Sequence, residues 1–401
     1  MNILVVGKAC PLKRANEILQ KSGKNPGYQI IKFMDLMIQG FVYNQQQVFV
    51  LSNVSNPSQI YSSSDTEVTN NIHYRYLPTI RIPILSQLLH TCYSFCYTLL
   101  WCIKTRGKKI ILCDIFANCS STGSLLAAKL FGVKTALLVT DMIAIPITTA
   151  LNTNKWWWNF FLQSRVHSQQ NGLKKYNCFV FLTKQMNDIY NPLQKPHIVM
   201  EGSVDHTFIP NANITKIQPR TIMYAGAIEE EYGFNELVQA FMKISDLDVE
   251  LHIYGTGKFV DTLIQYTHRD SRIKYFGVVN NKQVIDAEQK ATLLVNPRLS
   301  HPEFVKYSFP SKTSEYMLSG TPLLTTQLSG IPSEYFEYLY TFSEETINGM
   351  AKTMKEVISL PLEELQQKGL NAQKFVLENK NNIKQSKRIV DFFEQIIHNS
   401  H

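Results

Sequence analysis

The sequence predicts an α/β protein built from two doubly wound domains, and three observations lead to this prediction. Short apolar runs rich in β-branched residues alternate with segments of helical length along all 401 residues. The apolar runs are continuous, which is typical of parallel strands covered by helices on both faces. A stretch with four prolines, 191–219, divides the alternation into two series, and the chain is long enough for two domains.

The first series defines a predicted N-terminal domain, residues 1–200. Its strands are expected at 2–6, 47–51, 109–114, 135–140 and 178–182. Its helices are expected at 28–40, 84–103, 121–131 and 183–190. The segment 52–72 is rich in Ser and Asn, so we expect a loop there.

The second series defines a predicted C-terminal domain, residues 201–380, with a hinge near Gly202. Its strands are expected at 220–225, 249–254, 272–276, 291–296, 322–326 and 339–342. Its helices are expected at 233–244, 257–267, 281–289, 311–319, 344–358 and 362–378. A further helix, 381–397, has no strand after it and defines a separate C-terminal segment, 381–401.

The charge of the chain is divided unevenly between its halves. Residues 1–200 hold 20 Lys and Arg against 7 Asp and Glu (+13), whereas residues 201–401 hold 20 against 25 (−5). Such a split suggests that the first half faces something anionic. We find no RNA- or DNA-binding motif, so nucleic acid is not a predicted partner, and an anionic membrane surface fits better.

Two segments predict a peripheral membrane contact. Residues 84–109 combine an apolar helical stripe with four cations at its end, and a spanning helix is rejected because a strand begins at once at 109. Residues 155–165 contain Trp156-Trp157-Trp158 between Lys155 and Arg165, and Trp favours the membrane interface. The alternative for the three Trp residues is burial between domains or in an oligomer.

The cysteines and the first residues indicate a cytoplasmic protein. The seven Cys form no CxxC pair and no zinc-type spacing, so they predict reduced thiols and no metal site. The chain begins Met-Asn-Ile-Leu-Val-Val-Gly, which predicts a strand and not a secretory signal. No Gly-x-Gly-x-x-Gly follows this strand, so a dinucleotide cofactor is not expected.

The most informative block of the sequence runs from Ser308 to Pro322. A turn enters a short helix that carries Lys312 and Glu315 three residues apart, and Gly320-Thr321-Pro322 ends it. Residues three apart share a helix face, and a helix N-terminus attracts anions. Lys312 therefore suits a phosphate, and Glu315 suits a sugar diol, because a carboxylate accepts two hydroxyl groups.

Five such elements follow one another in a familiar order. They are Tyr224-Ala225-Gly226, Tyr254-Gly255-Thr256-Gly257, Phe276-Gly277, Asn296-Pro297-Arg298 and the block with Lys312 and Glu315. In order and spacing, residues 200–380 resemble the retaining GT-B glycosyltransferases of family 4, the glycosyl transferases group 1. The resemblance implies two Rossmann-like domains facing a central cleft, with the nucleotide-sugar donor on the second. It also implies that the last helix packs back on the N-terminal domain.

The resemblance and the positions of the residues together predict one set for donor binding and a smaller one for catalysis, which also includes Asp141. The donor-binding residues are Gly226, Gly255, Arg298, Tyr307, Ser311, Lys312 and Glu315. Glu315 would accept hydrogen bonds from the ribose hydroxyl groups. Arg298 and Lys312 would also be catalytic, because donors aimed at the leaving diphosphate lower the barrier.

The sequence departs from the family pattern at two places. Tyr307 stands where the family has the first Glu of a Glu-x7-Glu motif, and Glu303, Lys306 or the backbone of 306–309 are alternative sugar contacts. Ala227 and Tyr232 stand where the family has an Arg and a Lys, with Glu229-Glu230-Glu231 between them.

The acceptor is expected on the first domain. Asp141 ends a predicted strand, where it could orient or deprotonate an acceptor hydroxyl group, although a loop or helix-capping role fits equally well. Asp114 ends another strand with the same geometry. Gly27 and Tyr28 start the first predicted helix, where the family has a glycine-rich acceptor loop.

The sequence thus predicts a metal-independent hexosyltransferase that acts with retention and needs no cofactor. Its acceptor would be a saccharide or a lipid-linked saccharide, in the synthesis of bacterial capsule, exopolysaccharide or O-antigen. The protein would be cytoplasmic and peripheral on the inner face of the plasma membrane. The alternatives are a GT-B epimerase of a UDP-sugar and a catalytically weak scaffold of a polysaccharide assembly complex.

Overall fold

The computed structural model describes residues 1–22, 27–54, 61–62, 65–80, 82–142, 171–210, 214–245 and 248–399. The chain forms two compact units. The first comprises Met1–Ser203 together with Asn382–His401, and the second comprises Val204–Asn381. Each unit is a parallel α/β sheet covered by helices on both faces, as the alternation of the sequence predicts.

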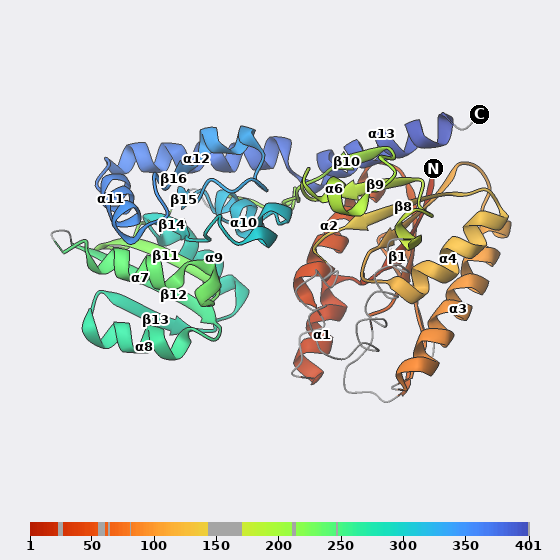
Figure 1. Cartoon of the computed structure of the whole chain (residues 1–401), viewed down its shortest axis with the longest axis horizontal. Coiled ribbons are helices and arrows are strands. Elements are labelled where there is room, and N and C mark those ends of the chain that lie inside the picture. The colour runs from red at the N-terminus through yellow and green to blue at the C-terminus, as the bar shows by residue number, and fades with distance from the viewer. Residues whose placement is uncertain are drawn as a thin grey trace, which may run out of the picture. The chain divides into compact units, whose positions relative to one another are not determined.

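The first unit is built on an eight-stranded sheet with the strand order β10-β9-β8-β7-β1-β2-β5-β4. Figure 1 labels β10, β9, β8 and β1 of this sheet. Its parallel strands are β1 (Asn2–Gly7), β2 (Gln47–Ser52), β5 (Ile72–Tyr76), β7 (Lys109–Asp114), β8 (Lys134–Val139), β9 (Cys178–Phe181) and β10 (His197–Val199). Only the edge strand β4 (Asp65–Thr69) is antiparallel. Strands β1 and β7 are almost wholly buried, which explains their continuous apolar sequences.

Helices cover both faces of this sheet. Ile3, Val5 and their neighbours share a core with α1 (Leu12–Ser22), α2 (Tyr28–Tyr43) and α13 (Asn382–His398). On the other side, α3 (Pro83–Lys104) and α4 (Asn118–Leu130) pack side by side. A short helix, α6 (Met186–Tyr190), follows β9. No described helix is long and apolar enough to cross a membrane.

The last helix, α13, packs against α2 although more than 300 residues separate them in the chain. Asn382 Nδ2 donates to the Leu36 carbonyl oxygen at 3.3 Å, and Ser386 Oγ donates to the Met37 carbonyl oxygen at 3.0 Å. Gly40 makes this approach possible, because a Cβ atom there would lie 2.3 Å from the Asn382 carbonyl oxygen. The two backbones therefore come close enough for hydrogen bonds between the helices.

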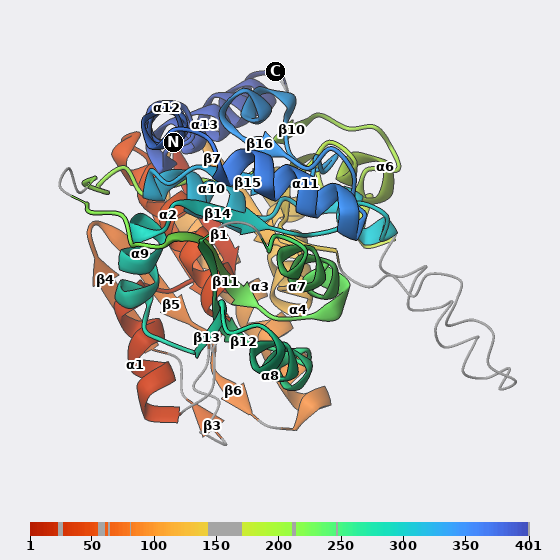
Figure 2. The same ribbon diagram turned by 90° about the vertical axis from the view of Figure 1, so that its left-hand side faces the viewer.

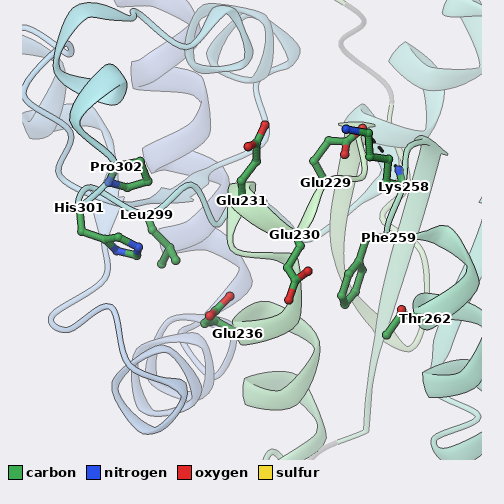
Figure 3. Close-up of a pocket in the computed structure, with 10 residues that line it drawn as sticks. All are labelled: Glu229, Glu230, Glu231, Glu236, Lys258, Phe259, Thr262, Leu299, His301 and Pro302. Carbon is green, nitrogen blue, oxygen red and sulfur yellow. Dashed lines mark hydrogen bonds between the residues drawn. The ribbon is translucent and has the colours of Figure 1, made fainter. Parts of the chain in front are cut away.

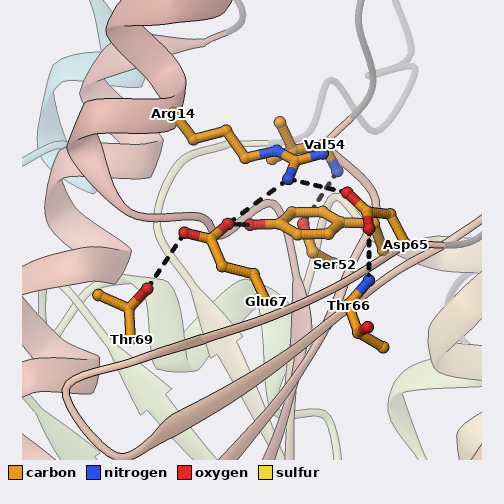
Figure 4. A network of polar contacts seen from close by, with 8 residues as sticks. Arg14, Ser52, Val54, Asp65, Thr66, Glu67 and Thr69 are labelled. Atoms are coloured by element: carbon orange, nitrogen blue, oxygen red, sulfur yellow. Dashed lines mark hydrogen bonds and ion pairs between the residues drawn. The ribbon is translucent and has the colours of Figure 1, made fainter.

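The segment 52–72 is not the plain loop that its composition predicts. It includes β3 (Tyr61–Ser62), which pairs with β6 (Thr79–Ile80), and the edge strand β4. Arg14 of α1 holds β4 in place through Asp65 (3.1 Å) and Glu67 (3.5 Å), and its guanidinium lies 3.7 Å from the centre of the Tyr76 ring (Figure 4). These tertiary contacts favour a strand where local composition favours a loop.

The second unit has a six-stranded, wholly parallel sheet with the order β13-β12-β11-β14-β15-β16 (Figure 2). Its strands are β11 (Arg220–Ala227), β12 (Val249–Thr256), β13 (Ile273–Gly277), β14 (Leu293–Asn296), β15 (Leu323–Thr325) and β16 (Tyr340–Thr341). Its helices are α7 (Phe234–Met242), α8 (Val260–Arg269), α9 (Asn281–Lys290), α10 (Ser311–Ser319), α11 (Ile347–Ile358) and α12 (Leu362–Asn379). A core on one face joins β11, β12, β14 and β15 to α7, α8 and α11.

Every predicted strand and helix is present, with ends that differ by no more than four residues. The predictions missed α1, so Tyr28 begins the second helix of the chain and not the first. They also missed the strands β3, β4, β5, β6 and β10, which are short, polar or at sheet edges. Short exposed strands carry little of the buried apolar sequence on which such predictions depend.

Candidate active site

The predicted donor residues gather at the carboxyl edge of the second sheet. β11 ends at Ala227, β12 at Thr256 and β14 at Asn296, and all three run parallel. Ligands of open α/β sheets bind beyond this edge. The loops that follow these strands, together with the N-terminus of α10, therefore define the candidate site.

Two glycines let the backbones of β11 and β12 meet closely at this edge. Gly226 and Gly255 are register partners, and a Cβ atom on Gly255 would lie 1.9 Å from the Gly226 carbonyl oxygen. Gly255 also has a φ of +125°, which side chains disfavour. A Cβ atom on Gly226 would lie 3.2 Å from Cε of Lys312, so this lysine reaches the end of β11.

Helix α10 presents Lys312 and Glu315 together. Lys312 Nζ lies 3.2 Å from Glu315 Oε2, and each side chain is about a quarter exposed. Lys312 Nζ also lies 5.5 Å from the centre of the Tyr316 ring, a cation–π distance. The structure thus brings Gly226, Lys312 and Glu315 into one place, with the lysine between the glycine and the carboxylate.

Tyr316 fixes α10 to β11. The Ala225 N–H donates to the Tyr316 hydroxyl oxygen at 2.8 Å, and the hydroxyl group donates to the Ala225 carbonyl oxygen at 3.1 Å. The strand β14 pairs with β11 only at Ile222 and Met223. The Tyr316 hydroxyl group therefore supplies hydrogen bonds at a position beyond the β14 pairing. This residue was not predicted, because only the folded structure brings it to β11.

Arg298 lies at the same edge and is held by aromatic rings. Its guanidinium carbon is 5.1 Å from the centre of the Tyr232 ring and 5.5 Å from that of Phe304. Arg298 follows the end of β14 at Asn296, and the Lys312 Cε atom would lie 3.2 Å from a Cβ atom on Gly226 of β11. Arg298 and Lys312 therefore both lie at the carboxyl edge of the sheet.

Two further donor candidates lie at or just before the start of α10. Ser311 is exposed at the first turn of α10, and Tyr307 is half-buried in the 3₁₀ turn Glu303–Tyr307. Their roles stay predictions.

A cluster of buried polar atoms was missed altogether. Asn296 and Thr325 are register partners at the ends of β14 and β15, and each is at least 95% buried. Among the described residues, neither Asn296 Nδ2 nor Thr325 Oγ1 has a hydrogen-bond partner. Thr313 and Ser314 of α10 have unpartnered buried hydroxyl groups as well. Polar residues directly after apolar runs were the sequence signal that could have found the first two.

An acidic hollow of about 530 Å³ lies beside the ends of β11 and β12 (Figure 3). Its lining includes four glutamates but only one lysine. The residues are Glu229, Glu230, Glu231, Glu236, Lys258, Phe259, Thr262, Leu299, His301 and Pro302. None of the predicted donor residues lines it, and its negative charge disfavours a phosphate.

In the first unit, Gly27 caps α2 in the left-handed conformation, with φ of +90°. A Cβ atom there would lie 2.7 Å from Lys8 Nζ, so the end of β1 and the start of α2 adjoin each other through Lys8. Tyr28 is the first residue of α2. Lys8 was not predicted, and it brings a positive charge to the proposed acceptor loop.

The two candidate acceptor carboxylates differ in their surroundings. Asp141 is exposed, and its Oδ1 accepts a hydrogen bond from the Met142 N–H at 2.7 Å. Asp114 is only 1% exposed at the end of β7, and it accepts from the backbone N–H groups of Phe116 (3.2 Å) and Lys8 (3.5 Å). Burial raises the pKa of Asp114 to about 6. The predicted membrane segment 155–165 lies outside the described residues.

Comparison with known families decides what this geometry belongs to. Residues 219–359, which include the ends of β11, β12 and β14 and all of α10, match the family of glycosyl transferases group 1. The chain contains a glycosyl transferases group 1 domain. A search of curated protein sequences finds no relative.

Solved glycosyltransferase structures match the whole chain. Sucrose-phosphate synthase from Thermosynechococcus elongatus is 11% identical with a TM-score of 0.67 and full coverage of both chains. Anabaena HepE in complex with UDP is 12% identical (TM-score 0.61, 98% of this chain and 100% of that one). The lipopolysaccharide outer core galactosyltransferase WaaB is 13% identical (TM-score 0.58, 98% and 99%). These likenesses show the GT-B fold, as the resemblance predicts.

Seen as a group 1 glycosyltransferase domain, the second unit has an unusual distribution of charge. The acidic hollow occupies the loop where the family resemblance leads us to expect an Arg and a Lys. Lys312 and Arg298 lie elsewhere at the carboxyl edge of the sheet and outside the lining of that hollow. The positive charge at this edge therefore comes from α10 and from the loop after β14.

Proposed function

We propose that the protein transfers a hexosyl group from a nucleotide-sugar donor to a saccharide or lipid-linked acceptor, with retention of configuration. The observation that carries this proposal is the contact of Lys312 with both Gly226 and Glu315 at the carboxyl edge of the second sheet. A cation, an open backbone and a carboxylate meet there, as a sugar nucleotide requires.

In this proposal, the diphosphate lies over Gly226, where the lack of a side chain lets it approach the backbone. Breaking the bond between the sugar carbon and the phosphate oxygen leaves negative charge on the diphosphate. Lys312 and Arg298 stabilise that charge, and each such preorganised group contributes roughly 3–4 kcal/mol in comparable sites. Side chains thus supply the positive charge that stabilises the leaving diphosphate, so we propose that the reaction needs no metal.

Glu315 would accept hydrogen bonds from the ribose hydroxyl groups. Its pairing with Lys312 supports this role, because the ion pair holds the carboxylate at the site. The acceptor hydroxyl group would bind on the first unit, near Gly27, Tyr28 and Asp141. It attacks the sugar carbon as the bond from that carbon to the phosphate oxygen breaks, and its proton passes to the Asp141 carboxylate.

The biological setting is also part of the proposal. We propose synthesis of a bacterial surface polysaccharide on the cytoplasmic face of the plasma membrane. WaaB, a lipopolysaccharide galactosyltransferase, supports this setting because it shares the fold over almost the full length of both chains.

A scaffold without catalytic activity is the second candidate function. The observation that favours it is the acidic hollow, which stands where the family resemblance places cations. A scaffold would bind a nucleotide without turning over any nucleotide-sugar. Incubation of the purified protein with UDP- and GDP-sugars, followed by measurement of the released nucleotide, separates the two functions.

The donor site is tested by comparing Glu315→Ala with Lys306→Ala. Lys306 is exposed in the turn before α10 and is a candidate contact of the sugar, not of the ribose, so it is a nearby control for nucleotide binding. We expect Glu315→Ala to weaken nucleotide binding by roughly 10- to 100-fold, because hydrogen bonds to a charged group contribute about 1.5–3 kcal/mol. Thermal shift with UDP and GDP measures this. Equal effects of the two variants would remove Glu315 from the ribose site.

A further inference from the structure

Helix α3 exposes an apolar stripe along its whole length. The members of this α3 stripe are Leu85, Leu88, Cys92, Cys96, Leu100 and Ile103. Their spacings of three and four residues place them on one side of the helix. Its four Leu and Ile side chains are each 46–59% exposed, and Ile84 beside them is 75% exposed.

The packed side of α3 is partly polar, which is the reverse of the usual pattern. Surface helices of soluble proteins turn polar residues to water and apolar ones to the core. In α3, Ser94 and Thr98 are fully buried, and Thr98 Oγ1 donates to Ser124 Oγ of α4 at 2.9 Å. Gly123 lets the helices approach, since a Cβ atom there would lie 2.2 Å from the Thr91 carbonyl oxygen. Small and polar residues hold α3 and α4 together and leave the larger apolar ones outside.

The charge around the α3 stripe has one sign. Residues 82–140 contain six Lys and Arg but a single acidic residue, Asp114, which is buried. Lys104, Arg106 and Lys108 are exposed directly at the end of α3, and Lys129 is exposed on α4. The neighbouring α4 also exposes Leu126 and Leu130. A surface that combines exposed apolar side chains with cations, and has no exposed carboxylate within residues 82–140, is complementary to an anionic lipid surface.

We infer that α3 lies flat on an anionic membrane, with the α3 stripe in the lipid boundary and the basic residues 104–108 at the headgroups. A second copy of the chain fits less well, because two such faces would bring their cations together. The inference deepens the proposed function. It rests on that proposal only for the reason why the protein binds a membrane, which is that the acceptor is held there. It adds the orientation of α3 and the contribution of α4 to the contact.

Vesicle flotation tests the apolar part. The triple Gln variant changes Leu88, Leu100 and Ile103. We expect it to bind phosphatidylcholine vesicles that contain phosphatidylglycerol roughly 100-fold more weakly than the parent, because each half-buried apolar side chain contributes about fivefold to the affinity. The matched control, Ile264→Gln, Val278→Gln, Leu370→Gln, changes three exposed apolar residues of the second unit. It should bind as the parent does, and equal losses in the two variants would overturn the inference.

The basic part is tested on the same vesicles. We expect the affinity for anionic vesicles to fall about fivefold in each of the variants Lys104→Gln, Arg106→Gln and Lys108→Gln. The affinity for neutral vesicles should hardly change. Lys282→Gln and Lys352→Gln, at exposed lysines of the second unit, are the controls. If the parent bound equally well with and without phosphatidylglycerol, and at low and high salt, the inferred anionic surface would be contradicted.

Two further readouts separate the possible failures. If the parent binds no vesicles and is a dimer that the triple Gln variant converts to monomers, the α3 stripe is a protein interface and the inference falls. Nucleotide stabilisation measured on the same variants reports the donor site of the second unit alone. Loss of flotation with intact nucleotide binding thus concerns only the membrane face, and the proposed transferase function stands or falls by turnover.

Discussion

Asp114 is the one acidic residue of the first unit's 82–140 region, and it is closed off from water. Its carboxylate accepts two backbone N–H groups at 3.2 and 3.5 Å, with Gly7 directly against its side chain. These weak contacts do not replace the lost hydration, so burial raises its pKa to about 6.

The raised pKa predicts a pH-dependent cost of ionisation. Because the folded-state pKa exceeds the unfolded value, the charged carboxylate destabilises the fold above about pH 6, and the cost fades as the pH falls toward 4. Asp114→Asn should therefore stabilise the first unit about 2 kcal/mol more at pH 7.5 than at pH 4.5, relative to the parent. Thermal unfolding at both pH values measures this. Exposed Asp141→Asn is the control, and an equal pH trend in that variant would refute the assignment.

At the scale of single residues, the sequence predicts those that lie close along the chain. Lys312 and Glu315 are three residues apart on one helix, and their ion pair of 3.2 Å follows from helical geometry. Tyr316 and Lys8 could not be predicted, because their contacts join segments that are distant in sequence. Asp114 and Asp141 have the same position at a strand end in the sequence. Only the folded structure shows that the first is buried and the second exposed.

At the scale of elements, α10 depends on one hydroxyl group for its attachment to β11. The Tyr316 oxygen pairs with both the N–H and the carbonyl oxygen of Ala225, and Tyr316 is fully buried. Lys312 and Glu315 sit on the same helix, one turn or less away. A change that loosens α10 should therefore lower the stability of the second unit and its nucleotide affinity together.

Tyr316→Phe tests this coupling. The variant leaves a buried N–H and a buried carbonyl oxygen unpaired, at a cost of about 1–3 kcal/mol each. We expect a clear fall in the melting temperature of the second unit and weaker UDP or GDP binding by thermal shift. Tyr266→Phe is the control, because the Tyr266 hydroxyl group donates at 3.0 Å to Asn235, which also accepts from Gln239. If both variants bind nucleotide as the parent does, α10 is not positioned by Tyr316.

Element prediction succeeded where burial dominates and failed where packing partners decide. The strands β1, β7 and β11 have continuous apolar centres because both faces are covered, so their sequences reveal them. The edge strand β4 is mostly exposed and has the sequence Asp-Thr-Glu-Val-Thr, and it forms because β5 and Arg14 hold it. For α3, the sequence shows an apolar stripe and a polar face, but not which of them faces solvent.

At the scale of the whole molecule, the chain divides into two units that do not follow the sequence order. The first unit takes its final helix from the C-terminus, since Asn382–His401 belongs with Met1–Ser203. The periodicity of the sequence indicates two α/β domains but does not show which one receives α13, and only the family resemblance implied that it is the first. Helix α13 places Ile389, Val390 and Phe393 in the core of the first unit, each at most 2% exposed.

Removing α13 should therefore affect the first unit and spare the second. A chain that ends at Asn381 loses three buried apolar side chains, worth roughly 5–9 kcal/mol, which is comparable with the stability of an entire domain. It also loses the hydrogen bonds that Asn382 and Ser386 make to α2. Calorimetry of the truncated chain should show the unfolding transition of the first unit lost or greatly lowered, with the nucleotide-stabilised transition of the second unit kept. A chain that ends at His398 keeps α13 and should unfold as the parent does. A first-unit transition unchanged in the shorter chain would show that α13 contributes little to that core, and loss of both transitions would show that the two units do not fold independently.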